Sequence, residues 1–446
     1  MKTNNVDMLS GSVFKGLLSI TMPIMIMNIM QTMFNVVDMS VLGNFVNDTA
    51  VGAVGACGTL IVLCTSLLIG IASGANVVIA KHIGRGDREH AERAVGCAVL
   101  FSIVGGLVLA VIGVSCAKIF LSWTNCPEEL IKQAAIYFRI YFLGVPVIMF
   151  YNFCASILRS IGDTKRPMLF LMLGGVIKIL LNFFFVTVFD MTVEGVAIAT
   201  IISNTIAGGL CFIVMLRSND MIRFNYKRMK FYGSELKQML YVGIPTGLQS
   251  SLYSLANTVI ATAVNRFGAD ATTGLSIANQ FDGILYQIVH APSLAIIPYV
   301  AQNIGAKNIN RAKEAVATSV IITIAFGASL GALSAIFSGQ LSSLMSSTPA
   351  VIMYSKQKMI IVSSTYFICG INEVLSGALR GMGKPIIPTI STLIFMCMLR
   401  IVWVHFVFPI CPTLTFLYLV WPIGWILCII IALSVFFPTL SKLQKL

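Results

Sequence analysis

The sequence predicts an all-helical protein that crosses a membrane many times, and three observations carry this prediction. Of the 446 residues, 57% are hydrophobic and only 11% are charged, whereas soluble domains carry about 25% charged residues. Apolar runs of about 20 residues recur along the chain, each long enough to cross a hydrocarbon core of ~30 Å as a helix. The two halves of the chain also repeat each other. We therefore expect an all-α polytopic fold and not a β-barrel, whose strands would show alternation over ~10 residues.

Charged breaks divide the apolar runs into twelve expected transmembrane helices. The first six lie at 15–44, 52–81, 94–118, 131–158, 167–189 and 194–216. The second six lie at 238–265, 272–303, 315–344, 352–379, 388–409 and 414–437. The first run is too long for the apolar core of a signal peptide and lacks a small-residue cleavage site, so we count it as a span.

Lysine and arginine residues set the expected orientation of these spans. With both termini inside, 22 of the 30 basic residues fall in inner segments and five fall in outer segments, among them Lys356 and Lys358. Cytoplasmic loops of membrane proteins carry this excess. We expect a multi-pass protein of the cell (plasma or inner) membrane with both termini cytoplasmic. The net charge of +13 comes from these loops, so the expected partner is the lipid bilayer and not nucleic acid.

An internal repeat with an offset near 221 relates the two halves of the chain. It pairs Ile83–Val95 with Ile304–Val316, Leu158–Gly162 with Leu379–Gly383 and, at an offset of 222, Pro23 with Pro245. Six spans per repeat is an even number, so both halves enter from the same side. Transporters with parallel repeats of this kind bind substrate between the halves. We predict an N-terminal six-helix lobe at 1–217, a cytoplasmic linker at 218–237 and a pseudo-symmetric C-terminal six-helix lobe at 238–446.

Asp38 is the most informative residue of the first span. An ionisable residue inside a membrane helix is costly and by default marks an ion or substrate pathway; the alternative is a surface residue at the membrane edge. At 1.5 Å per residue, Asp38 lies ~35 Å from Lys15 and Asn182 lies ~22 Å from Pro167, so a tilted first helix would let Asp38 and Asn182 approach. Apolar surroundings disfavour a charged carboxylate, which makes Asp38 a candidate proton carrier.

Further polar residues within the spans extend this to two candidate sites. The candidate cation-coupling site consists of Asp38, Asn182, Asn152, Asn204 and Thr200. The candidate substrate or second ionisable site consists of Glu373, Lys178, Asp282, Arg400 and His290. Buried cations need partners, so we expect Lys178 to pair with Asp38 or to line the lobe interior. We expect Arg400 to pair with Glu373.

For several of these residues a structural role is the alternative. Thr200 and Asn204 would then form hydrogen bonds between helices. Glu373 would pair with a basic residue at the inner rim of the membrane. His290 would be a hydrogen-bonded core histidine.

Short motifs recur over nearly the whole chain. They are Pro23 with Val37-Asp38 and Val41-Leu-Gly43, Ile83-Gly84, Arg159-Ser-Ile-Gly-Asp-Thr-Lys-Arg-Pro167, Gly195-Val-Ala-Ile-Ala-Thr200, Gln302-Asn-Ile-Gly-Ala306 and Leu375-Ser-Gly-Ala-Leu-Arg-Gly-Met-Gly383. Together they resemble the multidrug and toxic compound extrusion (MATE) family, within the wider multidrug/oligosaccharidyl-lipid/polysaccharide flippase superfamily. The resemblance implies two six-helix lobes around a V-shaped central cleft. It also implies export of organic, often cationic and aromatic, compounds in exchange for inward H⁺ or Na⁺.

The resemblance further implies that Asp38 binds the coupling cation, with Asn182 facing it. Many bacterial members carry an aspartate four residues after this asparagine. Here Val186 stands at that position, which removes one ligand from a Na⁺ site that Asp38 and Asn182 would form.

These observations favour a secondary active multidrug efflux antiporter that works by alternating access as a monomer on small organic molecules. An enzyme is not expected, because HExxH, GxSxG and Walker-type phosphate-binding motifs are absent. No cofactor and no resident metal are expected; the coupling ion is H⁺ or Na⁺. The alternative is a flippase for a lipid-linked oligosaccharide or polyprenyl-linked precursor. A flippase for anionic headgroups would place more basic residues within its spans than Lys178, Arg400 and Arg139.

Overall fold

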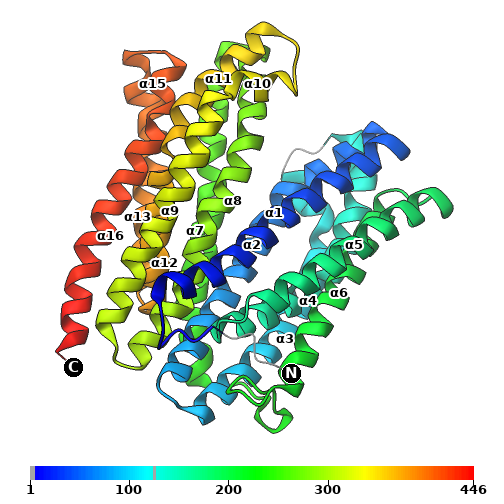
Figure 1. Ribbon diagram of the computed structural model, residues 1–446. Coiled ribbons are helices and arrows are strands. Elements are labelled where there is room, and N and C mark those ends of the chain that lie inside the picture. Colours follow the sequence, from blue (N-terminus) through cyan, green and yellow to red (C-terminus); the bar gives the residue numbers. More distant parts are fainter. Residues whose placement is uncertain (1–5, 124–126, 446) are drawn as a thin grey trace. The chain divides into compact units, whose positions relative to one another are not determined.

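The computed structural model describes residues 6–123 and 127–445, and these residues fold entirely into helices and the turns between them (Figure 1). No strand occurs among the described residues, so the all-α prediction is confirmed. A helix satisfies its backbone hydrogen bonds internally, which lipid cannot do for it. This is the physical reason why so apolar a sequence adopts helices.

Six long helices form the first half of the chain, one for each expected span. They are α1 (Val13–Phe45), α2 (Asp48–Gly84), α3 (Arg88–Trp123), α4 (Glu128–Ser160), α5 (Lys165–Val188) and α6 (Val193–Arg217). Each is longer than the apolar run that predicted it, and the added residues include charged ones such as Lys165 at the start of α5 and Arg217 at the end of α6. Asn47 begins α2 by accepting a hydrogen bond from the Ala50 backbone N–H at 2.8 Å, as an N-cap asparagine does.

The second half is divided into more elements. They are η1 (Tyr226–Arg228), α7 (Gly233–Val264), η2 (Asn265–Phe267), α8 (Ala269–Gly305), α9 (Ile309–Ile336), α10 (Ser338–Ser343), α11 (Pro349–Val362), η3 (Ser363–Thr365), α12 (Tyr366–Gly381), α13 (Ile386–Thr392), η4 (Leu393–Met398), α14 (Leu399–Val402), η5 (Trp403–Val407), η6 (Phe408–Ile410), α15 (Leu414–Tyr418) and α16 (Val420–Gln444). Expected spans seven and eight each correspond to one long helix, and the ninth, 315–344, corresponds to α9 followed by the short α10. Each of the last three expected spans contains more than one element.

The tenth expected span, 352–379, corresponds to the apolar segment Pro349–Gly381, which a 3₁₀ turn divides into two α-helices. The 3₁₀ turn η3 separates α11 from α12. The Ser364 hydroxyl donates to the Ile360 carbonyl oxygen at 2.5 Å, and the Thr365 hydroxyl donates to the Ile361 carbonyl oxygen at 3.0 Å. Side-chain bonds of this kind compete with the backbone ladder of a helix, so a run of serine and threonine interrupts the span.

The last two expected spans, 388–409 and 414–437, are also interrupted. Two π-helical segments, η4 and η5, flank the single turn α14, and η6 ends the eleventh span. π-helical turns occur frequently at functional sites, and α14 carries the buried Arg400. In the twelfth span, α15 ends at Tyr418, four residues before Pro422. Proline lacks the backbone N–H that would bond to that residue.

Length and composition mark the chain as a multi-pass membrane protein. Within the described residues, eleven segments are long and apolar enough to span a membrane. Helix α7 is not among the eleven, but it occupies the seventh expected span. Its 32 residues reach ~48 Å at 1.5 Å per residue, well beyond the ~30 Å hydrocarbon core.

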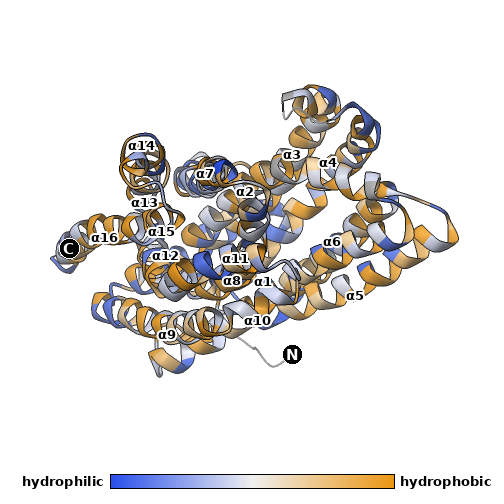
Figure 2. Cartoon of the chain, turned by 90° about the horizontal axis from the view of Figure 1, so that it is seen from above, coloured by the Kyte–Doolittle hydropathy of each residue, from blue (hydrophilic) through white to orange (hydrophobic). Residues whose placement is uncertain are grey.

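Hydrophobic residues occur along the whole length of the helices (Figure 2), and many of them are exposed. On α5 the exposed residues Leu169, Leu173, Val176 and Leu180 recur every three or four positions, so they form one stripe of the helix. A soluble monomer rarely exposes such continuous apolar surface. This stripe is suited to contact lipid.

The described helices group into two compact units. Unit 1 includes the described residues of 26–247, and unit 2 includes residues 8–25 and 248–445. The boundaries between the units therefore fall inside α1 and α7. The repeat predicts lobe boundaries at 217 and 238 instead. These boundaries describe the repeated halves of the sequence and stay a prediction.

The two repeats share details of the backbone. Gly162 and Gly383, which end α4 and α12, have φ angles of +79° and +74°. A left-handed glycine at this position closes a helix without the strain that a Cβ would add. Asp87 and Asn308 begin α3 and α9, each accepting a backbone N–H three residues later. Hydrogen bonds from the first turn of α3 hold the pKa of Asp87 below its ordinary value.

Candidate functional site

Helix α5 places two polar side chains on its buried stripe. Gly174, Lys178, Asn182 and Val186 are all buried and four residues apart, so they lie one above another on the helix. The opposite stripe carries the exposed leucines and valine described above. The local sequence therefore fixes the direction in which the ammonium of Lys178 and the amide of Asn182 point, into unit 1.

A close approach of two helices brings α1 to this stripe. A Cβ atom added at Gly175 would lie 1.8 Å from the ring of Phe34 on α1, which is too close for any other residue. Glycine thus allows the ring to rest on the backbone of α5. Asp38 follows Phe34 by four residues, or about one helical turn. It therefore reaches α5 about one turn from Gly175, at the level of Lys178.

Asp38, Lys178 and Asn182 form a buried polar network in unit 1. The Lys178 Nζ atom lies 2.6 Å from Asp38 Oδ2, and the Asn182 amide donates to Asp38 Oδ1 at 2.7 Å. Asp38 is 8% exposed, Lys178 7% and Asn182 0%. A charged pair this far from solvent is screened little, so each charge depends on the other.

The other residues of the predicted coupling site do not join this network. Asn152 donates to the Ile148 carbonyl oxygen, Thr200 to that of Val196, and Asn204 to that of Thr200. Each of these bonds stays within its own helix. For Thr200 and Asn204 the expected alternative is hydrogen bonding between helices. The two bonds of these residues lie within α6.

Two tyrosines near Asp38 were missed by the sequence reasoning. Tyr137 and Tyr141 on α4 interact electrostatically with Asp38, and their ring centroids lie 6.1 Å apart. They are one helical turn apart, so both aromatic rings and their hydroxyl groups lie on the same face of α4. That spacing was the available signal, but tyrosine is also common near membrane surfaces.

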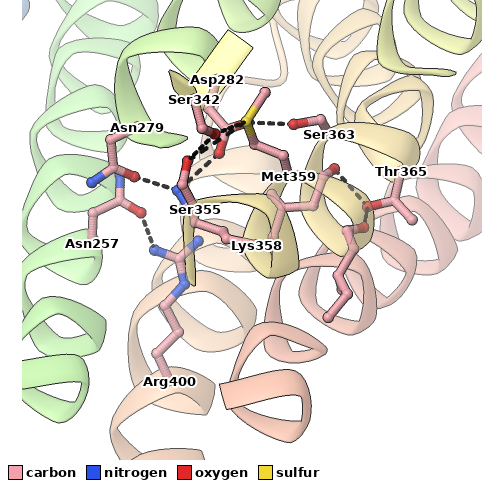
Figure 3. A network of polar contacts seen from close by, with 12 residues as sticks. Asn257, Asn279, Asp282, Ser342, Ser355, Lys358, Met359, Ser363, Thr365 and Arg400 are labelled. Carbon is pink, nitrogen blue, oxygen red and sulfur yellow. Dashed lines mark hydrogen bonds and ion pairs between the residues drawn. The ribbon is translucent and has the colours of Figure 1, made fainter. Parts of the chain in front are cut away.

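A second buried network lies in unit 2 (Figure 3). Lys358 Nζ on α11 lies 2.8 Å from Asp282 Oδ2 on α8, and Lys358 also donates to Asn279 Oδ1. The Ser363 hydroxyl of η3 donates to Asp282 Oδ1 at 2.7 Å. Lys358 is 1% exposed. Its ammonium therefore pairs with Asp282 inside the unit, and its expected place in an outer segment stays a prediction.

Arg400 does not pair with Glu373 as expected. Its Nη1 atom donates to Asn257 Oδ1 at 2.6 Å, and its guanidinium carbon lies 5.1 Å from the ring centroid of Trp421. Glu373 instead has a 3.7 Å contact between its Oε2 atom and His290 Nε2. Spacing along each helix places these residues at similar depths but does not specify which helices pack together.

Glu373 and His290 form a separate contact on α12 and α8. The imidazole of His290 stacks on the Tyr286 ring at 5.2 Å between centroids. Glu373 is 5% exposed. This arrangement holds the histidine between a carboxylate and an aromatic face, as a core histidine is held.

Comparison with known proteins gives the family. The family model MatE matches residues 23–184 and 245–404. Probable multidrug resistance protein YoeA of Bacillus subtilis is 28% identical over 390 residues, covering 86% of this chain and 84% of the relative. Probable multidrug resistance protein YpnP of the same organism is 27% identical over 396 residues, covering 88% of each.

Solved structures share the fold. A multidrug resistance MATE family transporter of the MOP superfamily, in an outward-facing conformation, matches with a TM-score of 0.91. Its sequence identity is 20%, and the match covers 100% of both chains. At that identity the likeness concerns the fold.

Proposed function

Because this chain belongs to the MatE family of membrane transporters, we propose that it exports organic compounds across the cell membrane in exchange for inward H⁺ or Na⁺. The names of the Bacillus relatives support a multidrug cargo. The proposal includes a monomeric transporter. It also includes cytoplasmic termini, and the excess of basic residues in the expected inner segments supports this orientation.

The observation that carries the proposal is the buried pair of Asp38 and Lys178 in unit 1. An intramembrane ion pair is costly to build and marks a functional site by default. A proton that enters and neutralises Asp38 removes the attraction that holds Lys178. The interaction between α1 and α5 then depends on whether Asp38 is protonated. A coupled conformational change requires such a difference in interaction energy between the protonated and deprotonated states.

The same geometry favours H⁺ over Na⁺ as the coupling ion. Asp38 Oδ2 already contacts the ammonium of Lys178 at 2.6 Å, and this cation repels a Na⁺ ion at the same oxygen. A sodium site also needs several oxygen ligands, and Val186 supplies none. The Asn182 Oδ1 atom is buried without a hydrogen-bond donor among the described residues, so it is available to accept a hydrogen bond from a protonated group in the site.

The test is uptake and release of ethidium, an aromatic cation, by proteoliposomes with H⁺ and Na⁺ gradients imposed separately. The wild-type protein should export ethidium with the proton gradient. Asp38→Asn should abolish gradient-driven export, whereas Glu129→Gln, an exposed carboxylate at the start of α4, should not.

Full export by Asp38→Asn would refute the role of this carboxylate. Export driven by the Na⁺ gradient alone would overturn the choice of H⁺. Movement of cargo driven by neither gradient would favour the alternative function, a flippase for a lipid-linked oligosaccharide or polyprenyl-linked precursor.

A further inference from the structure

We propose that unit 2 contains a binding site for an acidic group, a carboxylate or a phosphate, centred on Arg400. The acidic group belongs either to a transported organic compound or to a free inorganic anion. The first of these sources rests on the proposed transport function, and the site itself does not.

The guanidinium of Arg400 presents an unused pair of donors. Arg400 is 1% exposed, and its Nη1 atom is taken by Asn257. Its Nε and Nη2 atoms are buried and make no well-directed hydrogen bond in the described parts of the chain. Tyr253 interacts with the guanidinium, whose carbon lies 5.5 Å from the Tyr253 ring centroid, but it carries no negative charge. These two nitrogens lie on one edge of the planar group. That edge binds carboxylate and phosphate oxygens through two parallel hydrogen bonds.

The charges around Arg400 do not balance. Within the described residues, no Asp or Glu oxygen lies within 4.0 Å of its guanidinium, and the Asp282 carboxylate is already occupied by Lys358 and Ser363. Lys358 and Arg400 both lie over the ring of Trp421, at 5.6 and 5.1 Å from its centroid. Lys358 thus takes the Asp282 carboxylate, and the other buried carboxylate described in unit 2, Glu373, contacts His290. An aromatic face offsets only part of the cost of burying a charge, so an anion is the missing partner.

The internal repeat identifies the position of the missing partner. The offset of 222 that relates Pro23 to Pro245 also relates Lys178 to Arg400 and Asp38 to Ile260. In unit 1 the cation has its carboxylate on α1. In unit 2 the equivalent position on α7 holds the buried Ile260, which carries no charge. A bound acidic group would take the role in unit 2 that Asp38 has in unit 1.

The backbone around Arg400 fits a ligand site. Arg400 lies on the single turn α14, between the π-helical segments η4 and η5. π-helical turns are rare and occur frequently at functional sites. Arg400 points from this turn to Asn257 on α7, beside the network of Lys358 (Figure 3).

The experiment measures the thermal unfolding of the purified protein in detergent by calorimetry, at pH 7, with increasing sodium benzoate or sodium phosphate. In the wild-type protein, at least one of the two salts should raise Tm by several degrees and the effect should saturate. Arg400→Gln should lose this increase. Arg139→Gln removes an exposed arginine of α4 and should retain it, which controls for ionic strength and for loss of a positive charge.

The two salts distinguish the source of the acidic group. An increase with benzoate alone supports the acid group of an organic compound, and an increase with phosphate supports a free inorganic anion. No saturable increase in the wild-type protein, or an equal increase in Arg400→Gln, overturns the proposal.

A second variant keeps the proposal testable if Arg400→Gln does not fold. Arg400→Lys retains the charge but not the two-nitrogen edge, and it should weaken the apparent affinity at least tenfold. Unchanged affinity in Arg400→Lys overturns the proposal. Because no gradient or cargo is used, binding in a protein that exports nothing would refute the transport proposal alone.

Discussion

Separating the charges of Asp38 and Lys178 tests the interaction that dominates unit 1. Lys178→Met leaves the Asp38 carboxylate 8% exposed, with Asn182 as its remaining side-chain donor. At the observed 2.6 Å, two unit charges attract by about 6 kcal/mol at an effective dielectric constant of about 20. Breaking a buried pair from one side costs about 3–5 kcal/mol. We expect Lys178→Met and Asp38→Asn each to lower the free energy of unfolding by about 3 kcal/mol.

The double variant Asp38→Asn/Lys178→Met removes both charges and supplies the control. Because no buried charge is left without a partner, it should unfold within about 1 kcal/mol of the wild-type protein. Equilibrium unfolding of all four proteins in the same detergent gives the coupling energy. If the two single effects add to within about 0.5 kcal/mol, the pair does not carry the energy assigned to it. The double variant should still fail to export, since it has lost the carboxylate.

Three further predictions concern single positions. Gly175→Ala should lower the free energy of unfolding by about 1–3 kcal/mol through overpacking, because its Cβ would lie 1.8 Å from the Phe34 ring; wild-type stability would contradict this close approach. Asp87→Ala should cost roughly 1 kcal/mol by removing the cap of α3, and Asp87→Asn much less. Since the pKa of Asp87 is lowered in the folded protein, the stabilisation by its charge is present above the unfolded pKa of about 3.9 and is lost as pH falls through the folded pKa. Unfolding measured from pH 7 to 3 should show the Ala variant approaching the wild-type protein, and a constant difference would contradict this. Ile260→Asp should fold stably in the wild-type background but lose about 3 kcal/mol when Arg400→Gln removes its partner; equal stability in both backgrounds would argue against an ion pair at this position.

The placement of most helices could be predicted because lipid leaves the backbone few alternatives. An apolar run of sufficient length has to be a helix, whatever its neighbours are. The interruptions of the last three spans could not be predicted in the same way. Ser364 and Thr365 are compatible with a continuous helix. The 3₁₀ turn η3 is recognised only in the structure, where their hydroxyls donate to the carbonyl oxygens of Ile360 and Ile361.

The site in unit 1 was accessible from the sequence because both its depth and its direction follow from one helix at a time. Lys178 and Asn182 lie on one face of α5, and counting residues places Asp38 within their reach. Lys358 was not accessible in this way. A lysine near the end of a span reaches water as readily as it pairs, and its partner Asp282 lies on another helix far away in the sequence. The packing of two helices decides between these outcomes.

The repeat explains why the two units differ in chemistry although they share a scaffold. Lys178 and Arg400 occupy equivalent positions, and each is buried, so both units pay the same desolvation cost for a cation. Unit 1 offsets this cost internally with Asp38, and the pair is neutral when intact and positive when a proton occupies the carboxylate. Unit 2 has Ile260 in place of the acid, and under the anion-site proposal an external acidic group neutralises its arginine. Under the two proposals, a change of one residue between the repeats separates a site that responds to protons from a site that responds to anions.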